Sequence, residues 1–133
     1  MLEAQDLLQG RKAGRGPPTA LIVEDSGTDR RAMQAMLEGL GCRCDTSGNG
    51  EEGVLAALMG SYDIVFMDVM MPGMDGLAAT QFLHGQMGAN TPFIVGVSAL
   101  RSEGDRRRCL EAGMDYFVSK PVHRGALQSL LGS

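Results

Sequence analysis

Residues 64–76 read Ile-Val-Phe-Met-Asp-Val-Met-Met-Pro-Gly-Met-Asp-Gly. The four apolar residues at 64–67 predict a short buried strand, and Asp68 follows it directly. Pro72 and Gly73 mark a loop, after which residues 76–87 are expected to form a helix. A buried strand, a polar residue at its end, a loop and a helix together make one unit of an α/β fold.

The same alternation continues on both sides of this stretch. We expect strands at 20–23, 42–46, 64–67, 93–97 and 116–118, and helices at 26–40, 49–59, 76–87, 102–112 and 122–131. In the second helix Val54, Leu55 and Leu58 are the expected inward residues. Nearly continuous apolar strands between helices indicate a parallel sheet that is covered on both faces. The predicted fold is a doubly wound five-stranded α/β domain with the flavodoxin-like strand order 2-1-3-4-5.

Length and composition limit the function classes. A chain of 133 residues fits one domain, and its 44% hydrophobic and 21% charged residues are typical of globular proteins. No apolar run approaches the roughly 20 residues of a membrane-spanning helix, and no secretory signal precedes the domain. A net charge of −4 gives no field that would attract nucleic acid. We therefore expect a cytoplasmic protein with no direct nucleic-acid or membrane partner.

Residues 1–18 differ in composition from the rest of the chain. A short amphipathic piece at 2–8 runs into a stretch rich in glycine, arginine and proline. It reads as a flexible leader or linker before a domain at 19–133. A disordered leader and the end of a helix from an upstream domain both remain open. Three cysteines elsewhere lack metal-site spacing and are expected to be reduced thiols.

Polar residues follow four of the five predicted strands. Glu24 and Asp25 follow the first strand, Asp68 the third, Ser98 the fourth and Lys120 the fifth. Because the carboxyl ends of parallel strands share one edge of the sheet, these side chains are expected to converge. Two carboxylates about 4 Å apart repel by roughly 4 kcal/mol at an effective dielectric of 20. A cation should offset this repulsion, and an all-oxygen site suits Mg²⁺.

Asp68 stands alone on the central strand and is the candidate nucleophile. An aspartate can accept a phosphoryl group as an acyl phosphate. The Lys120 ammonium and the Ser98 hydroxyl could then bind the phosphoryl oxygens opposite the metal. Taken singly, each residue also has an ordinary explanation: Glu24 and Asp25 as an acidic pair at a helix start, Asp68 as a turn residue, Ser98 as a cap and Lys120 as a surface lysine. Only their joint occurrence at strand ends favours a site.

From Thr19 to Leu131 the chain resembles the receiver domain of response regulators. Residues 68–76 resemble that family's D-x-x-M-P-x-M-D-G stretch after its phosphorylated aspartate. Residues 97–99 resemble its strand end with a hydroxyl and a small residue, and residues 119–121 its lysine followed by a proline in a cis peptide. Residues 24–25 resemble its acidic pair, with glutamate where many members have aspartate.

The resemblance implies a role for each residue of the acidic pocket. Asp68 would be the phosphoacceptor. Asp25, Asp68 and the main-chain carbonyl of Met70 would bind Mg²⁺ directly, and Glu24 would act mainly through water.

It also implies a switch that involves Ser98, Lys120 and Phe117. Ser98 and Lys120 would hold the phosphoryl oxygens. Phe117 matches the aromatic residue that turns inward when the hydroxyl moves toward the phosphate. Tyr116 is the rival for that role because it is adjacent, and the expected strand register favours Phe117.

The implied function is a signalling switch rather than an enzyme with an independent substrate. A phosphohistidine on a histidine kinase or histidine phosphotransfer domain would donate to Asp68, and the receiver would dephosphorylate itself. Phosphorylation would shift the surface formed by the helix at 102–112, the strand at 116–118 and the helix at 122–131. Arg106, Arg107 and Arg108 read either as a solvated face or as a partner contact there. The sequence at residues 29–31, 113–115 and 119–121 most resembles that of receivers of hybrid histidine kinases. Whether the protein forms a homodimer is left open.

Three other functions are compatible with this architecture. The sequence argues against two of them and leaves the third open. A phosphatase with an aspartate nucleophile would need a second aspartate where Met70 stands. A flavin carrier would need a phosphate loop rich in hydroxyls and glycine where Glu24 and Asp25 stand. A receiver-shaped binding module that is never phosphorylated stays open, as do the cognate kinase, the signal and the output.

Overall fold

The structure is a computed structural model that describes residues 17–99 and 102–132, so most of the predicted leader lies outside the described residues. Five parallel strands form one sheet in the order β2-β1-β3-β4-β5. Their bounds are β1 Thr19–Val23, β2 Arg43–Ser47, β3 Ile64–Asp68, β4 Phe93–Ser98 and β5 Tyr116–Ser119. The helices are α2 Gly27–Gly39, α3 Gly50–Met59, α4 Gly76–Met87, α5 Glu103–Glu111 and α6 Arg124–Leu131, and a 3₁₀ turn, η1, covers Gly88–Asn90. The predicted fold class and strand order are confirmed.

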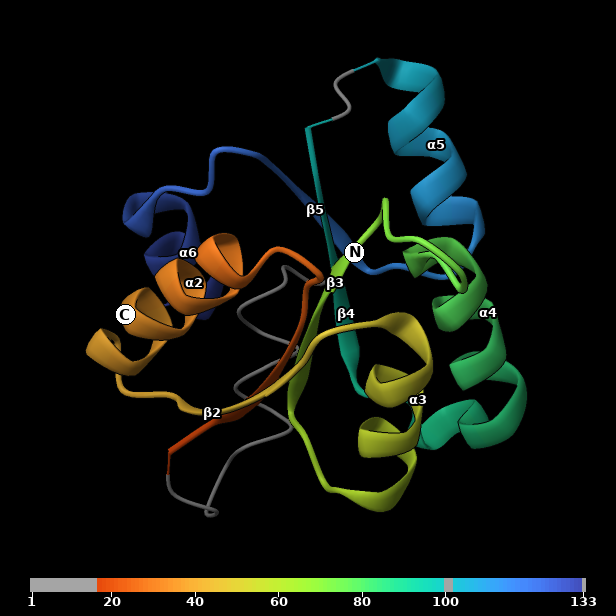
Figure 1. The fold of residues 1–133 in the computed structure, drawn as a ribbon, viewed down its shortest axis with the longest axis horizontal. Helices are drawn as coiled ribbons and strands as arrows, with labels where there is room; N and C mark the ends of the chain where they lie inside the picture. The colour runs from red at the N-terminus through yellow and green to blue at the C-terminus, as the bar shows by residue number, and fades with distance from the viewer. Residues whose placement is uncertain (1–16, 100–101, 133) are drawn as a thin grey trace.

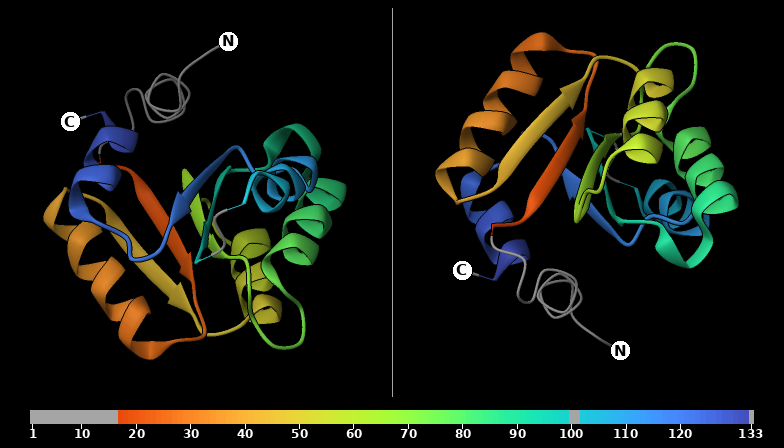
Figure 2. Two further views of the ribbon diagram at one scale, coloured as in Figure 1. Left: turned by 90° about the horizontal axis from the view of Figure 1, so that it is seen from above. Right: turned by 90° about the horizontal axis from the view of Figure 1, so that it is seen from below.

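The sheet separates two apolar cores, with α2 and α6 on one face and α3, α4 and α5 on the other (Figures 1 and 2). In β1 and β3 successive side chains alternate between the two cores. Ile22 and Phe66 point into the core under α2 and α6, whereas Val23 and Met67 point into the opposite core. Because both faces are buried, residues 20–23 of β1 and 64–67 of β3 are all apolar.

Helix starts lie close to the carboxyl ends of the strands they follow. A side-chain oxygen caps four of the helices by accepting a backbone N–H from the first turn. The capping residues are Ser26 for α2, Asn49 for α3, Asp75 for α4 and Ser102 for α5. The sheet edge that carries the polar strand ends therefore also carries the positive ends of these helix dipoles.

The prediction for the inward face of α3 was partly wrong. Val54 is buried as expected, but the Leu55 side chain is 57% exposed and that of Leu58 is also exposed. The small residues Gly53 and Ala57 face the sheet instead. A helix with apolar residues on several sides does not reveal its buried face from residue type alone, and close packing here selects the smallest residues.

No helix within residues 17–99 or 102–132 has the length and apolar character needed to cross a membrane.

The close contact between α3 and β1 gives a stability prediction. A Cβ at Gly53 would lie 2.6 and 2.7 Å from the two Val23 methyl carbons. We expect Gly53→Ala to lower the free energy of unfolding by about 1–3 kcal/mol, because overpacking outweighs the gain in helix propensity. Gly85, on the exposed side of α4, has open space around the same position. The matched control Gly85→Ala should therefore raise stability by about 0.5–1 kcal/mol, and urea unfolding measures both. Equal effects at the two positions would contradict this packing.

Candidate functional site

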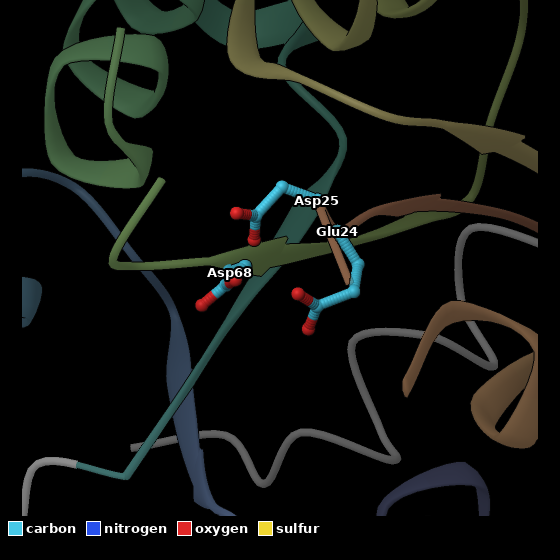
Figure 3. Close-up of side chains that lie close together, drawn as sticks. All are labelled: Glu24, Asp25 and Asp68. Carbon is cyan, nitrogen blue, oxygen red and sulfur yellow. The ribbon is translucent and has the colours of Figure 1, made fainter. Parts of the chain in front are cut away.

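Three carboxylates converge beyond the ends of two neighbouring strands. Glu24 follows β1 directly, and Asp68 is the last residue of β3, which pairs with β1. One carboxylate oxygen from each of Glu24, Asp25 and Asp68 lies within 4.8 Å of the others, and Figure 3 shows the three side chains projecting into the same space. Glu24 and Asp68 are each only 4% exposed, whereas Asp25 is exposed. The predicted acidic cluster is thus formed.

Lys120 brings a positive charge to this cluster from the far side of β4. Its Nζ lies 2.8 Å from Glu24 Oε1 and 3.7 Å from Asp68 Oδ2. The Lys120 backbone N–H donates to the Ser98 carbonyl at 2.8 Å, which fixes the start of the loop to the end of β4. The Lys120–Pro121 peptide is cis, as the sequence resemblance implied.

Backbone and side-chain hydrogen bonds orient the acidic residues. The Ser26 backbone N–H donates to Glu24 Oε2 at 3.1 Å, and the Arg30 guanidinium donates from Nη1 to the Glu24 carbonyl at 2.9 Å. The Met70 backbone N–H donates to Asp68 Oδ1 at 3.3 Å. The Glu24 and Asp68 carboxylates thus each accept a backbone N–H from the residue two positions further along the chain.

Burial and the neighbouring negative charge destabilise the ionised form of Asp68. Burial, followed by the hydrogen bond and charge of Glu24, raises the pKa of Asp68 to about 8, against the opposing effects of Lys120 and the Met70 N–H. Burial alone would lower the pKa of the Lys120 ammonium, but its hydrogen bond to Glu24 and the charges of Asp68 and Glu24 raise it above its ordinary value. The pocket thus carries more negative charge than its lysine offsets.

The other predicted site residues surround this pocket. Ser98 ends β4 and is buried. Phe117 is 8% exposed and packs in the core under α3, α4 and α5, whereas Tyr116 is 42% exposed. The expected strand register, which placed Phe117 inward, is confirmed. Met70 lies in the loop after Asp68 with an exposed side chain, so its side chain contributes little packing there.

The donor set fits a magnesium ion. Carboxylate oxygens are the hard ligands that Mg²⁺ prefers, and the ion keeps several waters. Asp68 is destabilised in its ionised form when no cation balances it, so a divalent ion would relieve a repulsion that the protein alone does not remove. The residues that would hold it are Glu24, Asp25, Asp68 and the Met70 carbonyl.

Sequence reasoning missed two residues at this site, Asp29 and Arg30. Lys120 Nζ lies 3.2 Å from Asp29 Oδ2, and Arg30 binds the Glu24 carbonyl. Both lie in the first turns of α2, which begins at the same sheet edge. Their nearness to Asp25 along the chain was the available signal, but an acidic residue in a first helical turn is also ordinary.

Comparison with known proteins identifies related sequences. Residues 20–131 match the family described as response regulator receiver domain. Sensor histidine kinase RcsC of Salmonella typhi is 40% identical over 111 residues, which cover 84% of this chain and 12% of that protein. Two-component response regulator 24 of Arabidopsis thaliana is 38% identical over 114 residues, covering 85% of this chain and 81% of that protein. The chain thus spans about one eighth of the length of the sensor kinases it matches.

Solved structures agree in fold. The receiver domain of sensor histidine kinase PA1611 from Pseudomonas aeruginosa PAO1, with a magnesium ion coordinated in its active site cleft, has a TM-score of 0.78 at 33% identity, covering 89% of this chain and 100% of that chain. The receiver domain of Ssk1 from Saccharomyces cerevisiae, in a co-crystal structure with the histidine phosphotransfer protein Ypd1, is the second example. That match has a TM-score of 0.81 at 25% identity and covers 87% of each chain.

The raised pKa of Asp68 predicts how stability depends on pH in metal-free protein. The unfolded carboxyl ionises near pH 3.8 and the folded one near pH 8, so between these values the folded state holds one more proton. The stability contributed by Asp68 is therefore complete below pH 3.8 and is lost as the pH rises through about 8. Asp68→Asn should remove this slope and raise the free energy of unfolding at pH 8 by on the order of 1 kcal/mol.

Added magnesium should stabilise the wild type more than Asp68→Asn. Thermal unfolding at pH 8 with chelator and then with millimolar Mg²⁺ should show a clear rise in Tm for the wild type and a smaller one for Asp68→Asn, because the ion binds the folded site. A wild type that is as stable as Asp68→Asn at pH 8 without metal would contradict the proposed charge balance.

Proposed function

The chain belongs to the response regulator receiver domain family, and we propose that its Asp68 accepts a phosphoryl group from a phosphohistidine on a histidine kinase or histidine phosphotransfer partner. The family match makes it a signalling switch rather than a conventional enzyme with an independent substrate. The observation that supports Asp68 as the acceptor is the convergence of Glu24, Asp25, Asp68 and Lys120 at one sheet edge.

The proposed step uses groups already in place. A carboxylate oxygen of Asp68 attacks phosphorus, an O–P bond forms as the P–N bond to the donor imidazole breaks, and the imidazole leaves with the electron pair and takes up a proton. The Lys120 ammonium and the Ser98 hydroxyl bind the phosphoryl oxygens as charge develops on them. Slow hydrolysis of the acyl phosphate in the same pocket would return the protein to its resting state.

Magnesium completes this pocket in the proposal. Asp25, Asp68 and the Met70 carbonyl would hold the ion, with Glu24 acting mainly through water. Once bound, it supplies positive charge that offsets the charge of the phosphoryl oxygens and of the three carboxylates. The Mg²⁺ in the cleft of the PA1611 receiver supports this choice of ion.

The partner class follows from related proteins. The Ssk1 receiver forms a complex with the phosphotransfer protein Ypd1, and several relatives are sensor histidine kinases. We therefore assign this chain a phosphohistidine donor. The cytoplasmic location expected from the composition remains part of the proposal. Residues 1–18 as a leader or linker and 19–133 as the receiver remain the predicted division of the chain.

The readout surface in this proposal is formed by α5, β5 and α6. Phe117 is buried in the core beneath α5, one strand away from Ser98, so a movement of the Ser98 hydroxyl can be passed to β5 through packing. Arg106, Arg107 and Arg108 are exposed on α5 and would belong to the surface that a partner reads.

Phosphorylation of the isolated protein tests the assignment of Asp68. With a small acyl phosphate and Mg²⁺ we expect the wild type to gain the mass of one phosphoryl group, and to gain none in excess chelator. Asp68→Asn should gain none. Asp75→Asn is the matched control, because Asp75 lies in the same loop but caps α4 through the Ala78 N–H, and asparagine caps equally well. Intact-protein mass spectrometry measures all four samples.

Two results would contradict this assignment. Phosphorylation of Asp68→Asn at the wild-type rate would place the acceptor elsewhere. No mass gain with any phosphodonor would favour a receiver-shaped binding module instead.

Hydrogen exchange tests the proposed readout surface. Phosphorylation should change amide exchange mainly in 102–131, and Ser98→Ala should reduce these changes while Asp68 can still be modified, because the hydroxyl that couples the phosphate to Phe117 is gone. Mass spectrometry of peptides from the phosphorylated and resting forms gives the measurement. Changes confined to α2 and α3 would refute this choice of surface.

A further inference from the structure

The Lys120 ammonium lies closer to Glu24 and Asp29 than to Asp68 in this structure. Its Nζ lies 2.8 Å from Glu24 and 3.2 Å from Asp29, but 3.7 Å from Asp68. The lysine therefore lies nearer to two carboxylates that would not receive a phosphoryl group than to the one that would. A phosphoryl group on Asp68 would have to draw the ammonium away from at least one of them.

Glu24 and Asp29 both compete with Asp68 for the Lys120 ammonium, and Asp29 is the one that can be replaced without changing the acidic cluster. Glu24 is buried and belongs to the acidic cluster that would face a metal ion, together with Asp25 and Asp68. Asp29 is about half exposed and is no member of that cluster. It lies in the first turn of α2, and its backbone N–H donates to the cap oxygen of Ser26, so the backbone that carries it is fixed.

Ion pairs contribute to the position of the lysine. A hollow of about 390 Å³ adjoins Asp29 and Lys120 and is lined on its other sides by Met33, Met36 and Pro121, among others. The methionine and proline side chains of this hollow carry no charge, and the space beside the lysine leaves room for its stem to move. A change in the carboxylates around Nζ can therefore shift the position of the ammonium.

We propose that Asp29 is a positioning residue that holds Lys120 on the α2 side of the pocket in the resting protein, and so lowers the affinity of the site for a phosphoryl group. The proposal rests on the proposed role of Asp68 as the acceptor. Asp29 binds neither the metal nor the phosphoryl group. It acts only through Lys120, and its loss makes the lysine available to the phosphoryl oxygens.

The test compares variants at position 29 in the full chain. Asp29→Asn keeps the size and removes the charge, whereas Asp29→Glu keeps the charge. Glu38→Gln is the control for loss of one negative charge from α2, because Glu38 lies near the other end of the helix and binds Gln34. Circular dichroism checks folding, and Asp29→Ala provides a second neutral variant.

Two readouts apply to each protein in Mg²⁺. The first is the rate of phosphorylation by a small acyl phosphate. The second is the affinity for beryllium fluoride, which mimics a phosphoryl group on an aspartate without any transfer step. Both should increase by about two- to fivefold in Asp29→Asn, since one partly exposed ion pair no longer has to be broken. Asp29→Glu and Glu38→Gln should stay near the wild type, and Mg²⁺ affinity should hold within twofold in all variants.

A double-mutant cycle separates action through Lys120 from a general charge effect. In a Lys120→Met background, Asp29→Asn should leave beryllium fluoride affinity unchanged, because the group that Asp29 holds is absent. Tighter binding in that background would show that Asp29 repels the anion directly, and would overturn the proposal.

The remaining outcomes are also decisive. Unchanged or slower phosphorylation of Asp29→Asn, or an equal gain in Asp29→Glu, refutes the role of Asp29 while leaving the role of Asp68 intact. If the wild type neither gains a phosphoryl group nor binds beryllium fluoride, the proposed roles of Asp29 and of Asp68 are both refuted.

Discussion

Repulsion among three carboxylates is the constraint on which this site depends. The parallel sheet places Glu24, Asp25 and Asp68 together at the ends of β1 and β3, and two of the three are buried. Lys120 contacts this cluster, and the pKa of Asp68 remains raised in spite of it. A protein selected only for stability would not gather acidic residues in this way. A divalent cation would offset this repulsion, so the cost to stability indicates a functional site rather than a structural one.

The strand order explains why a lysine supplies the positive charge. β4 separates β5 from β3, so a side chain at the end of β5 must reach across one strand to meet Asp68. Lysine has a flexible four-carbon stem that can span this gap. The bond between the Lys120 N–H and the Ser98 carbonyl anchors its base. The same flexibility allows the ammonium to pair with Asp29, which lies outside the cluster of three carboxylates.

Much of the fold and of the pocket could be predicted from the sequence, and the reasons are physical. Buried parallel strands are short apolar runs, so β3 and β4 were located within a residue or so of their bounds. Parallel strands also share one edge for their carboxyl ends, so the convergence of Asp25, Asp68 and Lys120 followed from topology alone. The register of β5 followed from the alternation of Tyr116 and Phe117.

The errors came from features that sequence periodicity does not encode. Leu55 and Leu58 were expected inside, but Gly53 and Ala57 are buried instead, and at Gly53 the Val23 side chain leaves no room for a Cβ. Asp29 has the appearance of an ordinary acidic residue in the first turn of a helix. Its contact with Lys120 joins residues 91 positions apart, and only the placement of α2 beside the loop after β5 reveals it.

Chemical identification of the modified residue tests the central claim most directly. The protein is phosphorylated by a phosphohistidine donor in Mg²⁺, the acyl phosphate is reduced with borohydride, and the digested peptides are sequenced by mass spectrometry. The predicted result is conversion of Asp68, and of no other acidic residue, to homoserine. Reduction at Asp25 or Asp75, or a phosphoryl group found on a histidine or serine instead, would contradict the assignment of Asp68 as the acceptor.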